Sequence, residues 1–121
     1  MIFCARYCSI CKSTHIERWG MSLVCRRLVW DGGYVHTTPV ERAIIWRLML
    51  AREGLRLEMR ELIEAAWGHR SDGGPLAARI GIAVNLSRIR KALRSSAAPM
   101  NIANAPRGRG FRQAYEMKKA G

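Results

Sequence analysis

A stripe of apolar side chains over residues 82–93 constrains the fold of this chain more than any other feature. The stripe has spacings of four, three and four residues, at Ile82, Leu86, Ile89 and Leu93. These spacings place its members on one face of an α-helix, where they can pack against a hydrophobic core. The pattern predicts an amphipathic helix that begins at Pro75 and runs to about Arg94.

The opposite face of this predicted helix is polar and basic. It carries Val84, Asn85, Ser87, Arg88, Lys91 and Arg94. In the major groove of DNA an asparagine pairs with an adenine edge, an arginine pairs with a guanine edge, and an apolar side chain contacts a thymine methyl group. A helix that is buried on one side and basic on the other therefore fits a major groove. Arg90 and Arg94 point toward one flank, where contacts with phosphate are expected.

The positive charge of the chain is concentrated in its last third. The 121 residues include 21 basic and 9 acidic side chains, a net charge of +12. Residues 1–28 hold five basic and one acidic (+4), residues 29–78 six and seven (−1), and residues 79–121 ten and one (+9). This polarity favours a polyanion bound on one side, most simply nucleic acid. The alternative interpretation is a basic surface that only keeps the chain soluble.

Hydropathy gives no sign of a membrane partner. No run approaches the ~18–20 consecutive apolar residues that a membrane span needs, and no unbroken apolar segment follows a basic start as in a secretory signal. We therefore expect a cytoplasmic protein, in which the four cysteines are thiols or metal ligands rather than disulfides.

Two β-hairpins are expected to flank the helical part of the chain. Residues 27–37 contain Asp31-Gly32, a pair that supplies the positive φ angles of a tight turn. Residues 100–115 alternate glycine with arginine and phenylalanine near their middle, which predicts a second hairpin.

Three helices are expected between these hairpins. Residues 38–41 (TPVE) form a capping box with proline at the first helical position, which predicts a helix over residues 39–53 ending at Gly54. A second helix is expected over residues 58–67, and the third is the amphipathic helix. Trp46 and Trp67 fall at helical spacing with apolar residues and are expected in the core.

Four segments, in the same order and spacing, resemble one known family. They are residues 38–41 (TPVE), residues 60–68 (RELIEAAWG), residues 82–93 (IAVNLSRIRKAL) and residues 107–111 (RGRGF). Together they resemble the start of the first helix, the second helix, the recognition helix and the wing of OmpR/PhoB-type effector domains. The resemblance spans roughly residues 27–115 and implies an α+β fold, a winged helix-turn-helix with a short N-terminal β-hairpin, three helices and a C-terminal hairpin wing.

The chain departs from this family in three places. Members usually follow a receiver domain and begin with a four-stranded sheet, whereas only about 25 residues precede the first hairpin here. Phosphorelay control is therefore not implied. The first wing strand, residues 102–107 (IANAPR), is one residue longer than the family's pattern. Residues 71–75 (SDGGP) occupy the loop that in the family can touch RNA polymerase.

The resemblance implies a sequence-specific, double-stranded DNA-binding transcriptional regulator from a bacterium or a phage. The third helix would enter the major groove and the wing the adjacent minor groove, where Arg109, between two glycines, meets negative potential. The predicted DNA-contacting residues are Arg79, Val84, Asn85, Ser87, Arg88, Arg90, Lys91, Arg94, Arg107, Arg109 and Arg112. Because one module covers few base pairs, a homodimer on repeated half-sites or help from a partner is expected.

The N-terminal segment has the composition of a metal site. Cys4, Cys8, Cys11 and His15 supply a Cys3His set, with Cys25 as an alternative fourth ligand, and thiolates with imidazole suit Zn²⁺. The alternative is that these cysteines are free thiols packed as small hydrophobes. A further alternative takes Met21 as the natural start, which would make residues 1–20 an extension without function. We divide the chain into an N-terminal extension (residues 1–26), a DNA-binding domain (27–117) and a tail (118–121).

Two other classes of function are compatible with the sequence. A compact basic winged helix also serves as a protein-interaction module, which would bind RNA polymerase or another acidic partner. A regulator that responds to zinc or redox state through the N-terminal cysteines is the other alternative. An enzyme is not expected, because His36 and His69 have no Ser or Cys nucleophile at an evident spacing and no phosphate-binding glycine loop is present.

Overall fold

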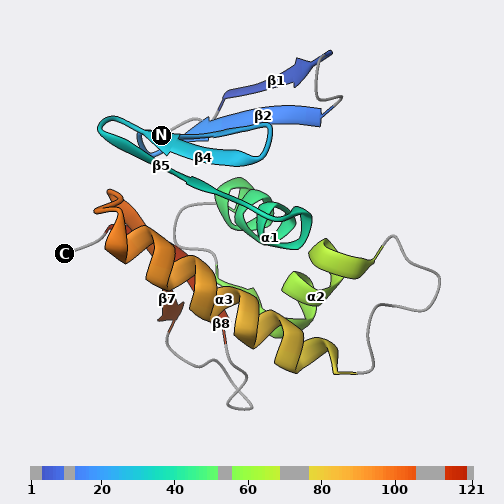
Figure 1. Ribbon diagram of the computed structural model, residues 1–121. Coiled ribbons are helices and arrows are strands. Elements are labelled where there is room, and N and C mark those ends of the chain that lie inside the picture. The colour runs from blue at the N-terminus through green and yellow to red at the C-terminus, as the bar shows by residue number, and fades with distance from the viewer. Residues whose placement is uncertain (1–3, 10–12, 52–55, 69–76, 106–113, 120–121) are drawn as a thin grey trace.

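The computed structural model describes residues 4–9, 13–51, 56–68, 77–105 and 114–119, with the backbone alone at residues 4–8, 13, 14 and 105. Within these ranges the fold is α+β, with three helices and two antiparallel sheets (Figure 1). The elements are β1 (Cys4–Cys8), β2 (Ser13–Arg18), β3 (Met21–Val24), β4 (Arg27–Trp30), β5 (Gly33–His36), α1 (Pro39–Leu50), β6 (Leu57–Glu58), α2 (Met59–Trp67), α3 (Ala78–Ser95), β7 (Met100–Ala105) and β8 (Ala114–Lys119).

Five strands form the N-terminal sheet, in the order β1-β2-β3-β4-β5 with every neighbour antiparallel. The predicted hairpin is present as β4 and β5, with Gly32 at a φ of 95° in its turn. The expectation of a short hairpin alone was wrong, because three further strands precede it. The expected boundary between residues 26 and 27 falls in the turn that joins the paired strands β3 and β4.

The inner face of this sheet is apolar and packs toward α1. Ile16, Met21, Leu23 and Leu28 are almost fully buried on it, and strand alternation leaves the intervening side chains on the outer face. Residues 13–18 are therefore part of the folded structure, and the interpretation of residues 1–20 as an extension without a role does not fit the buried Ile16.

Helix α1 begins as predicted and ends earlier. The Thr38 hydroxyl accepts from the Glu41 N–H, and the Glu41 carboxylate accepts from the Thr38 N–H, which confirms the capping box. The helix ends at Leu50 rather than at residue 53, because Ala51 already has extended backbone. Arg18 from β2 donates to the carbonyl oxygens of Met49 and Ala51. The carbonyls that the helix leaves unpaired at its C-terminus are thus bonded by a distant side chain.

Helices α2 and α3 pack on each other through a glycine. Gly68 follows α2, as predicted, and its N–H donates to the Glu64 carbonyl. A Cβ at Gly81 of α3 would lie 3.0 Å from the ring of Trp67, so the absence of a side chain there lets the indole approach. Trp67 is buried in the core as expected. Helix α3 begins at Ala78, because Ala77 lies outside the helical region; the predicted start at Pro75 lies outside the described residues.

The C-terminal hairpin belongs to a three-stranded sheet in the order β6-β8-β7. Its strands are longer than the predicted 100–115 hairpin, since β8 continues to Lys119, which pairs with Met100. Lys118 and Lys119 are therefore in a strand, although the sequence analysis assigned residues 118–121 to a tail. The two-residue strand β6 was not expected, because two residues carry no periodicity.

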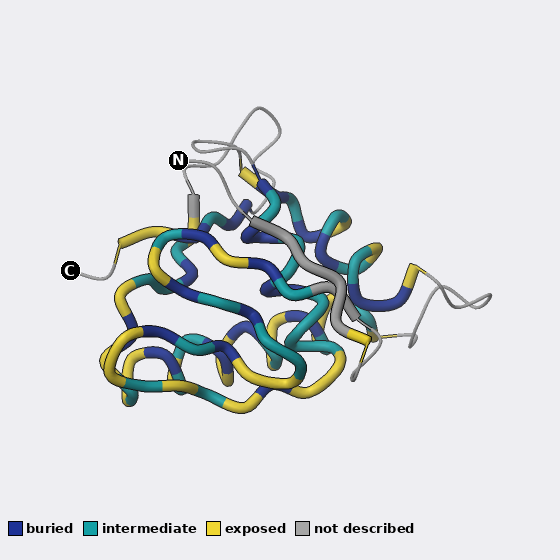
Figure 2. The backbone as a smooth tube through the Cα atoms, turned by 90° about the horizontal axis from the view of Figure 1, so that it is seen from above, coloured by how far each residue is buried: buried dark blue, intermediate teal, exposed yellow. Residues whose placement is uncertain are grey.

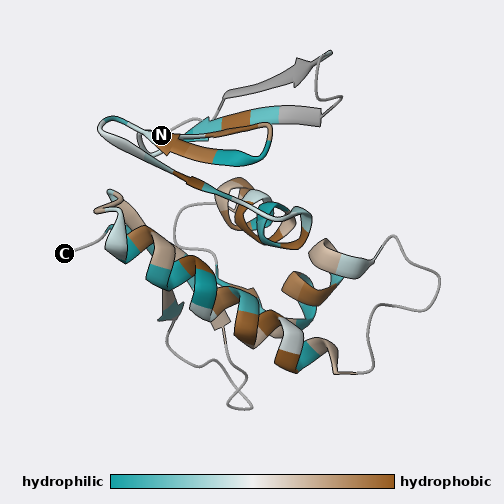
Figure 3. Cartoon of the chain, viewed as in Figure 1, coloured by the Kyte–Doolittle hydropathy of each residue, from teal (hydrophilic) through white to brown (hydrophobic). Residues whose placement is uncertain are grey.

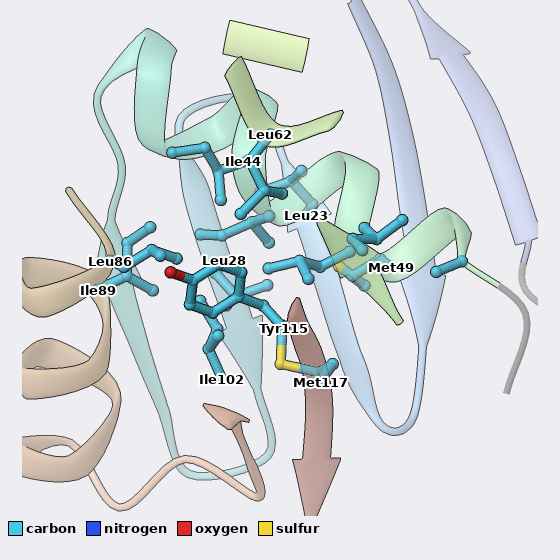
Figure 4. Close-up of a cluster of buried hydrophobic side chains, with 14 of the residues drawn as sticks. Leu23, Leu28, Ile44, Met49, Leu62, Leu86, Ile89, Ile102, Tyr115 and Met117 are labelled. Atoms are coloured by element: carbon cyan, nitrogen blue, oxygen red, sulfur yellow. The ribbon is translucent and has the colours of Figure 1, made fainter. Parts of the chain in front are cut away.

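A single hydrophobic core joins the two sheets and the helices. In Figure 4, Leu23 and Leu28 from the sheet, Ile44 from α1 and Ile102 and Tyr115 from the C-terminal hairpin converge on one cluster. Figure 2 shows buried and exposed residues alternating along the strands and helices, as elements with one inward face require. Within the described residues, none of the helices combines the length and apolar composition that crossing a membrane requires.

Candidate nucleic-acid interface

Helix α3 is amphipathic as its sequence predicts. Its apolar stripe is buried, with Ile82 and Leu93 at 0% and 1% exposure. Hydrophilic and hydrophobic residues alternate along the helix in Figure 3. The exposed residues of α3 are Arg79, Ile80, Ala83, Val84, Ser87, Arg88, Lys91, Arg94 and Ser95. Six of the predicted DNA-contacting residues therefore lie exposed on one helix: Arg79, Val84, Ser87, Arg88, Lys91 and Arg94.

The charge on α3 is of one sign. The helix contains five basic residues and no acidic residue. Between described residues, no ion pair joins a cation of α3 to a carboxylate; the ion pairs found there are Arg47–Glu61, Arg60–Glu58 and Lys118–Glu116. The exposed face of α3 is therefore a source of positive potential that other parts of the described chain do not neutralise by direct contact.

Two apolar side chains are exposed on the same face. Ile80 is 67% exposed and Val84 is 43% exposed, and they lie four residues apart, one helical turn. Val84 was predicted as a contact for a thymine methyl group, whereas Ile80 was missed. The spacing of four residues from Val84 is the sequence signal that identifies Ile80 as part of this face. The two side chains give this basic face an apolar portion close to the start of α3.

Asn85 is placed differently from its exposed neighbours. Its side chain is half-buried, and the Nδ2 atom donates to the Gly81 carbonyl at 2.7 Å within the same helix. The sequence placed Asn85 beside Arg88 on the exposed face. Contact with an adenine edge stays a prediction, and this bond leaves Oδ1 and the second Nδ2 hydrogen for it.

Arg90 links α3 to the C-terminal hairpin. Its Nε donates to the Ile102 carbonyl at 3.0 Å and its Nη2 to Asn104 Oδ1 at 2.6 Å. In return, Asn101 donates to the Arg90 carbonyl at 3.3 Å. The side chain that the sequence assigned to phosphate is thus held against β7, and it fixes the hairpin relative to α3.

The wing arginines cannot be placed in the same way. Arg107, Arg109 and Arg112 lie outside the described residues, in the connection between Ala105 and Ala114. These two alanines are paired at one end of β7 and β8. The connection that carries the predicted wing contacts therefore starts and ends at adjacent points of the hairpin.

The predicted metal ligands are partly brought together. Cys25 Sγ and His15 Nε2 are 3.3 Å apart, and Cys4 and Cys8 lie at the two ends of β1. Cys11 is outside the described residues. Among side chains that the structure does describe, no group of three or more His, Cys, Asp and Glu residues could hold a metal ion.

A groove lined by residues of α1 and α2 was not predicted. It has a volume of about 350 Å³ and is lined by Arg42, Ala43, Trp46, Arg47, Leu50 and Ala65. The Arg42 guanidinium lies 5.5 Å from the ring centroid of Trp46, and Arg47 pairs with Glu61 at 3.7 Å. Trp46, expected in the core, is only half-buried because one side of its ring faces this groove.

No protein-family model matches this chain, and no curated protein is significantly similar to it in sequence.

Proposed function

We propose that this chain is a winged-helix transcriptional regulator of the OmpR/PhoB type, which reads double-stranded DNA with α3 in the major groove and the C-terminal hairpin at the adjacent minor groove. The observation that carries the proposal is the exposed face of α3, which presents Arg79, Arg88, Lys91 and Arg94 with no acidic residue in the helix. A helix of this kind supplies phosphate contacts along its edges and base contacts at its centre.

The order and pairing of the elements support the proposal. Three helices are followed by a hairpin that pairs with the short strand β6 ahead of α2. Members of the family begin with a sheet of four strands, and in this chain a sheet of five strands, rather than the expected short hairpin, precedes α1.

Direct bonds between the two proposed DNA-contacting elements give further support. Arg90 and Asn101 join α3 to β7 through hydrogen bonds in both directions. A helix and a hairpin that are held together in this way approach two adjacent grooves as one unit, which favours readout without a large rearrangement.

Titration with duplex DNA at several salt concentrations tests this function. Neutralisation of several phosphates makes the logarithm of the affinity fall linearly with the logarithm of the salt concentration. Arg88→Ala is expected to weaken binding markedly. Arg27→Ala removes the same charge from the exposed face of β4, on the sheet rather than on α3, and is expected to have little effect. Equal losses of DNA affinity in the two variants would indicate that the net charge of the protein, rather than α3, attracts the DNA.

We also propose that two copies of this chain bind repeated half-sites. One α3 helix and one hairpin cover few base pairs, and genomic specificity needs a longer site. Binding to a duplex with two half-sites is expected to be tighter than binding to either half-site alone.

The groove on α1 and α2 supports a second candidate function, a protein-interaction module for an acidic partner such as RNA polymerase. Arg42 and Arg47 supply positive charge at its border, and Trp46 with Leu50 supplies an apolar floor. Aromatic and arginine side chains are the types that dominate protein interfaces. Arg47→Glu is expected to abolish binding of RNA polymerase in a direct binding assay without changing DNA affinity; unchanged polymerase binding would remove this candidate.

A further inference from the structure

The turn between β3 and β4 presents a cysteine in a strained and fixed conformation. Cys25 has a φ of 53°, which residues other than glycine rarely adopt. Its carbonyl oxygen accepts from Arg42 Nε at 2.8 Å, and the next residue, Arg26, accepts from the Thr37 N–H at 2.8 Å. The start of α1 thus holds the turn in place. Backbone strain that is maintained by its surroundings is typical of functional positions.

The thiol of this turn meets a histidine from the neighbouring strand. Cys25 Sγ and His15 Nε2 are 3.3 Å apart. In a tetrahedral zinc site, with Zn–S near 2.3 Å and Zn–N near 2.0–2.1 Å, two such ligands are separated by about 3.5 Å. The two atoms are therefore already spaced as a pair of ligands to one ion, although a direct contact between thiol and imidazole has a similar distance.

Strand register brings one further cysteine to the same level of the sheet. Cys25 is the first residue after β3, at the end of the sheet where β2 begins, and the β2–β3 register extended into this turn would put it near the level of Thr14. Cys8 pairs with Ser13, one residue from that level, and Cys4 pairs with Glu17, three residues from it. At about 3.4 Å per residue, Cys4 is roughly 10 Å along the strand and Cys8 only about 3 Å. Cys4 and Cys8 pair with residues that are each two positions from His15, so the level of Cys25, rather than that of His15, separates the two candidates.

We propose that Cys25, His15 and Cys8 bind one Zn²⁺ ion at this end of the N-terminal sheet, with the fourth position open to water or a further ligand. Two thiolates and an imidazole are the ligand types that zinc prefers, and each thiol loses its proton when the metal binds. The ion would join the edge strand β1 to β2 and to the β3–β4 turn, and through the Arg42 bond to the start of α1. Metal binding thereby stabilises the sheet, independently of DNA binding.

Titration of the reduced, metal-free full chain with Co²⁺, followed by displacement with Zn²⁺, tests this site. The expected spectrum has the intense visible bands of tetrahedral cobalt and thiolate-to-cobalt charge transfer. Cys25→Ser, His15→Ala and Cys8→Ser are each expected to weaken Co²⁺ binding at least about tenfold. Cys4→Ser, a matched change in the same strand, is expected to leave it unchanged. Circular dichroism of each metal-free variant checks that the fold is retained.

Two results would overturn the proposal. One is a reduced wild-type chain that gives no tetrahedral cobalt spectrum. The other is a loss of Co²⁺ affinity in Cys4→Ser as large as in Cys8→Ser, which would show that the third ligand is not fixed at the Cys8 end of β1. Thermal unfolding adds a second measurement, because Zn²⁺ is expected to raise the midpoint of the wild type and not that of Cys25→Ser.

Discussion

Arg90 on α3 donates from Nε to the carbonyl oxygen of Ile102 on β7 at a distance of 3.0 Å. The same guanidinium reaches Asn104 Oδ1, and its ring neighbour is Tyr115, 5.8 Å from the guanidinium carbon to the ring centroid. This side chain, with Asn101 that donates to the Arg90 carbonyl, therefore holds the hairpin against the helix. Arg90 therefore links two elements of the fold, whereas Arg88, two residues earlier on the same helix, is exposed.

Arg90→Ala is expected to destabilise the fold by about 1–2 kcal/mol, because it removes two hydrogen bonds and leaves the Ile102 carbonyl without this donor. Urea unfolding measures the change in the free energy of unfolding. Arg94→Ala is the control, since this exposed arginine on the same helix is expected to change stability by no more than about 0.5 kcal/mol. Equal effects of the two substitutions would contradict the structural role of Arg90.

Arg18→Met is expected to destabilise the protein by about 1–3 kcal/mol. Arg18 is 6% exposed and donates to the carbonyls of Met49 and Ala51 at the end of α1, while methionine retains most of the aliphatic stem and none of the donors. Amide hydrogen exchange is expected to quicken most in the last turn of α1. An unchanged exchange rate there, with the fold destabilised elsewhere, would show that the bonds do not control the end of this helix.

Thr38→Ala is expected to lower the free energy of unfolding by about 1 kcal/mol, because the Glu41 N–H loses the hydroxyl acceptor of the capping box. Thr38→Ser keeps an oxygen at the same place and is expected to retain most of the stability. Thermal unfolding of the three proteins ranks them. If serine were as destabilising as alanine, the methyl group of Thr38 rather than its hydroxyl would account for the loss.

Lys91→Ala is expected to weaken DNA binding about equally on every duplex and to reduce the salt slope by about one, as loss of a single phosphate contact does. Lys91 is exposed on α3, and the only acidic residue between residue 79 and the end of the chain is Glu116. Fluorescence anisotropy on two unrelated duplexes, at four or more salt concentrations, gives both quantities. A loss confined to one duplex would instead indicate a base contact.

The helical part of the fold could be predicted because its signals are local. The apolar stripe of α3 and the capping box at Thr38 each lie within one continuous segment, as does the Asp31-Gly32 turn of the β4–β5 hairpin. Strands β1 to β3 are no shorter than β4 and β5, but the buried Arg18 breaks the apolar alternation of β2. The cysteines of this segment also favoured a metal site over a sheet. These strands are stabilised by pairing with one another and by packing on α1. Such contacts join residues far apart in the sequence, so a short segment does not reveal them.

The residue types of the candidate site could be predicted, but the hydrogen-bond partners of its side chains could not. The exposure of Val84 and Arg88 follows from helical periodicity alone. Arg90, however, bonds to residues 12 and 14 positions away, and Asn85 bonds back to Gly81. Both side chains have partners that depend on tertiary packing and on the choice of rotamer, so residue type and spacing alone did not reveal them.

In vitro selection from a random duplex library at near-physiological salt, run in parallel on the wild type and Arg88→Ala, tests the central claim most directly. The account predicts an enriched sequence motif for the wild type and its loss or relaxation at one position in the variant, with a cost of about 1–3 kcal/mol on the selected site. Recovery of no motif by the wild type, with binding that only weakens with salt, would contradict sequence-specific readout by α3.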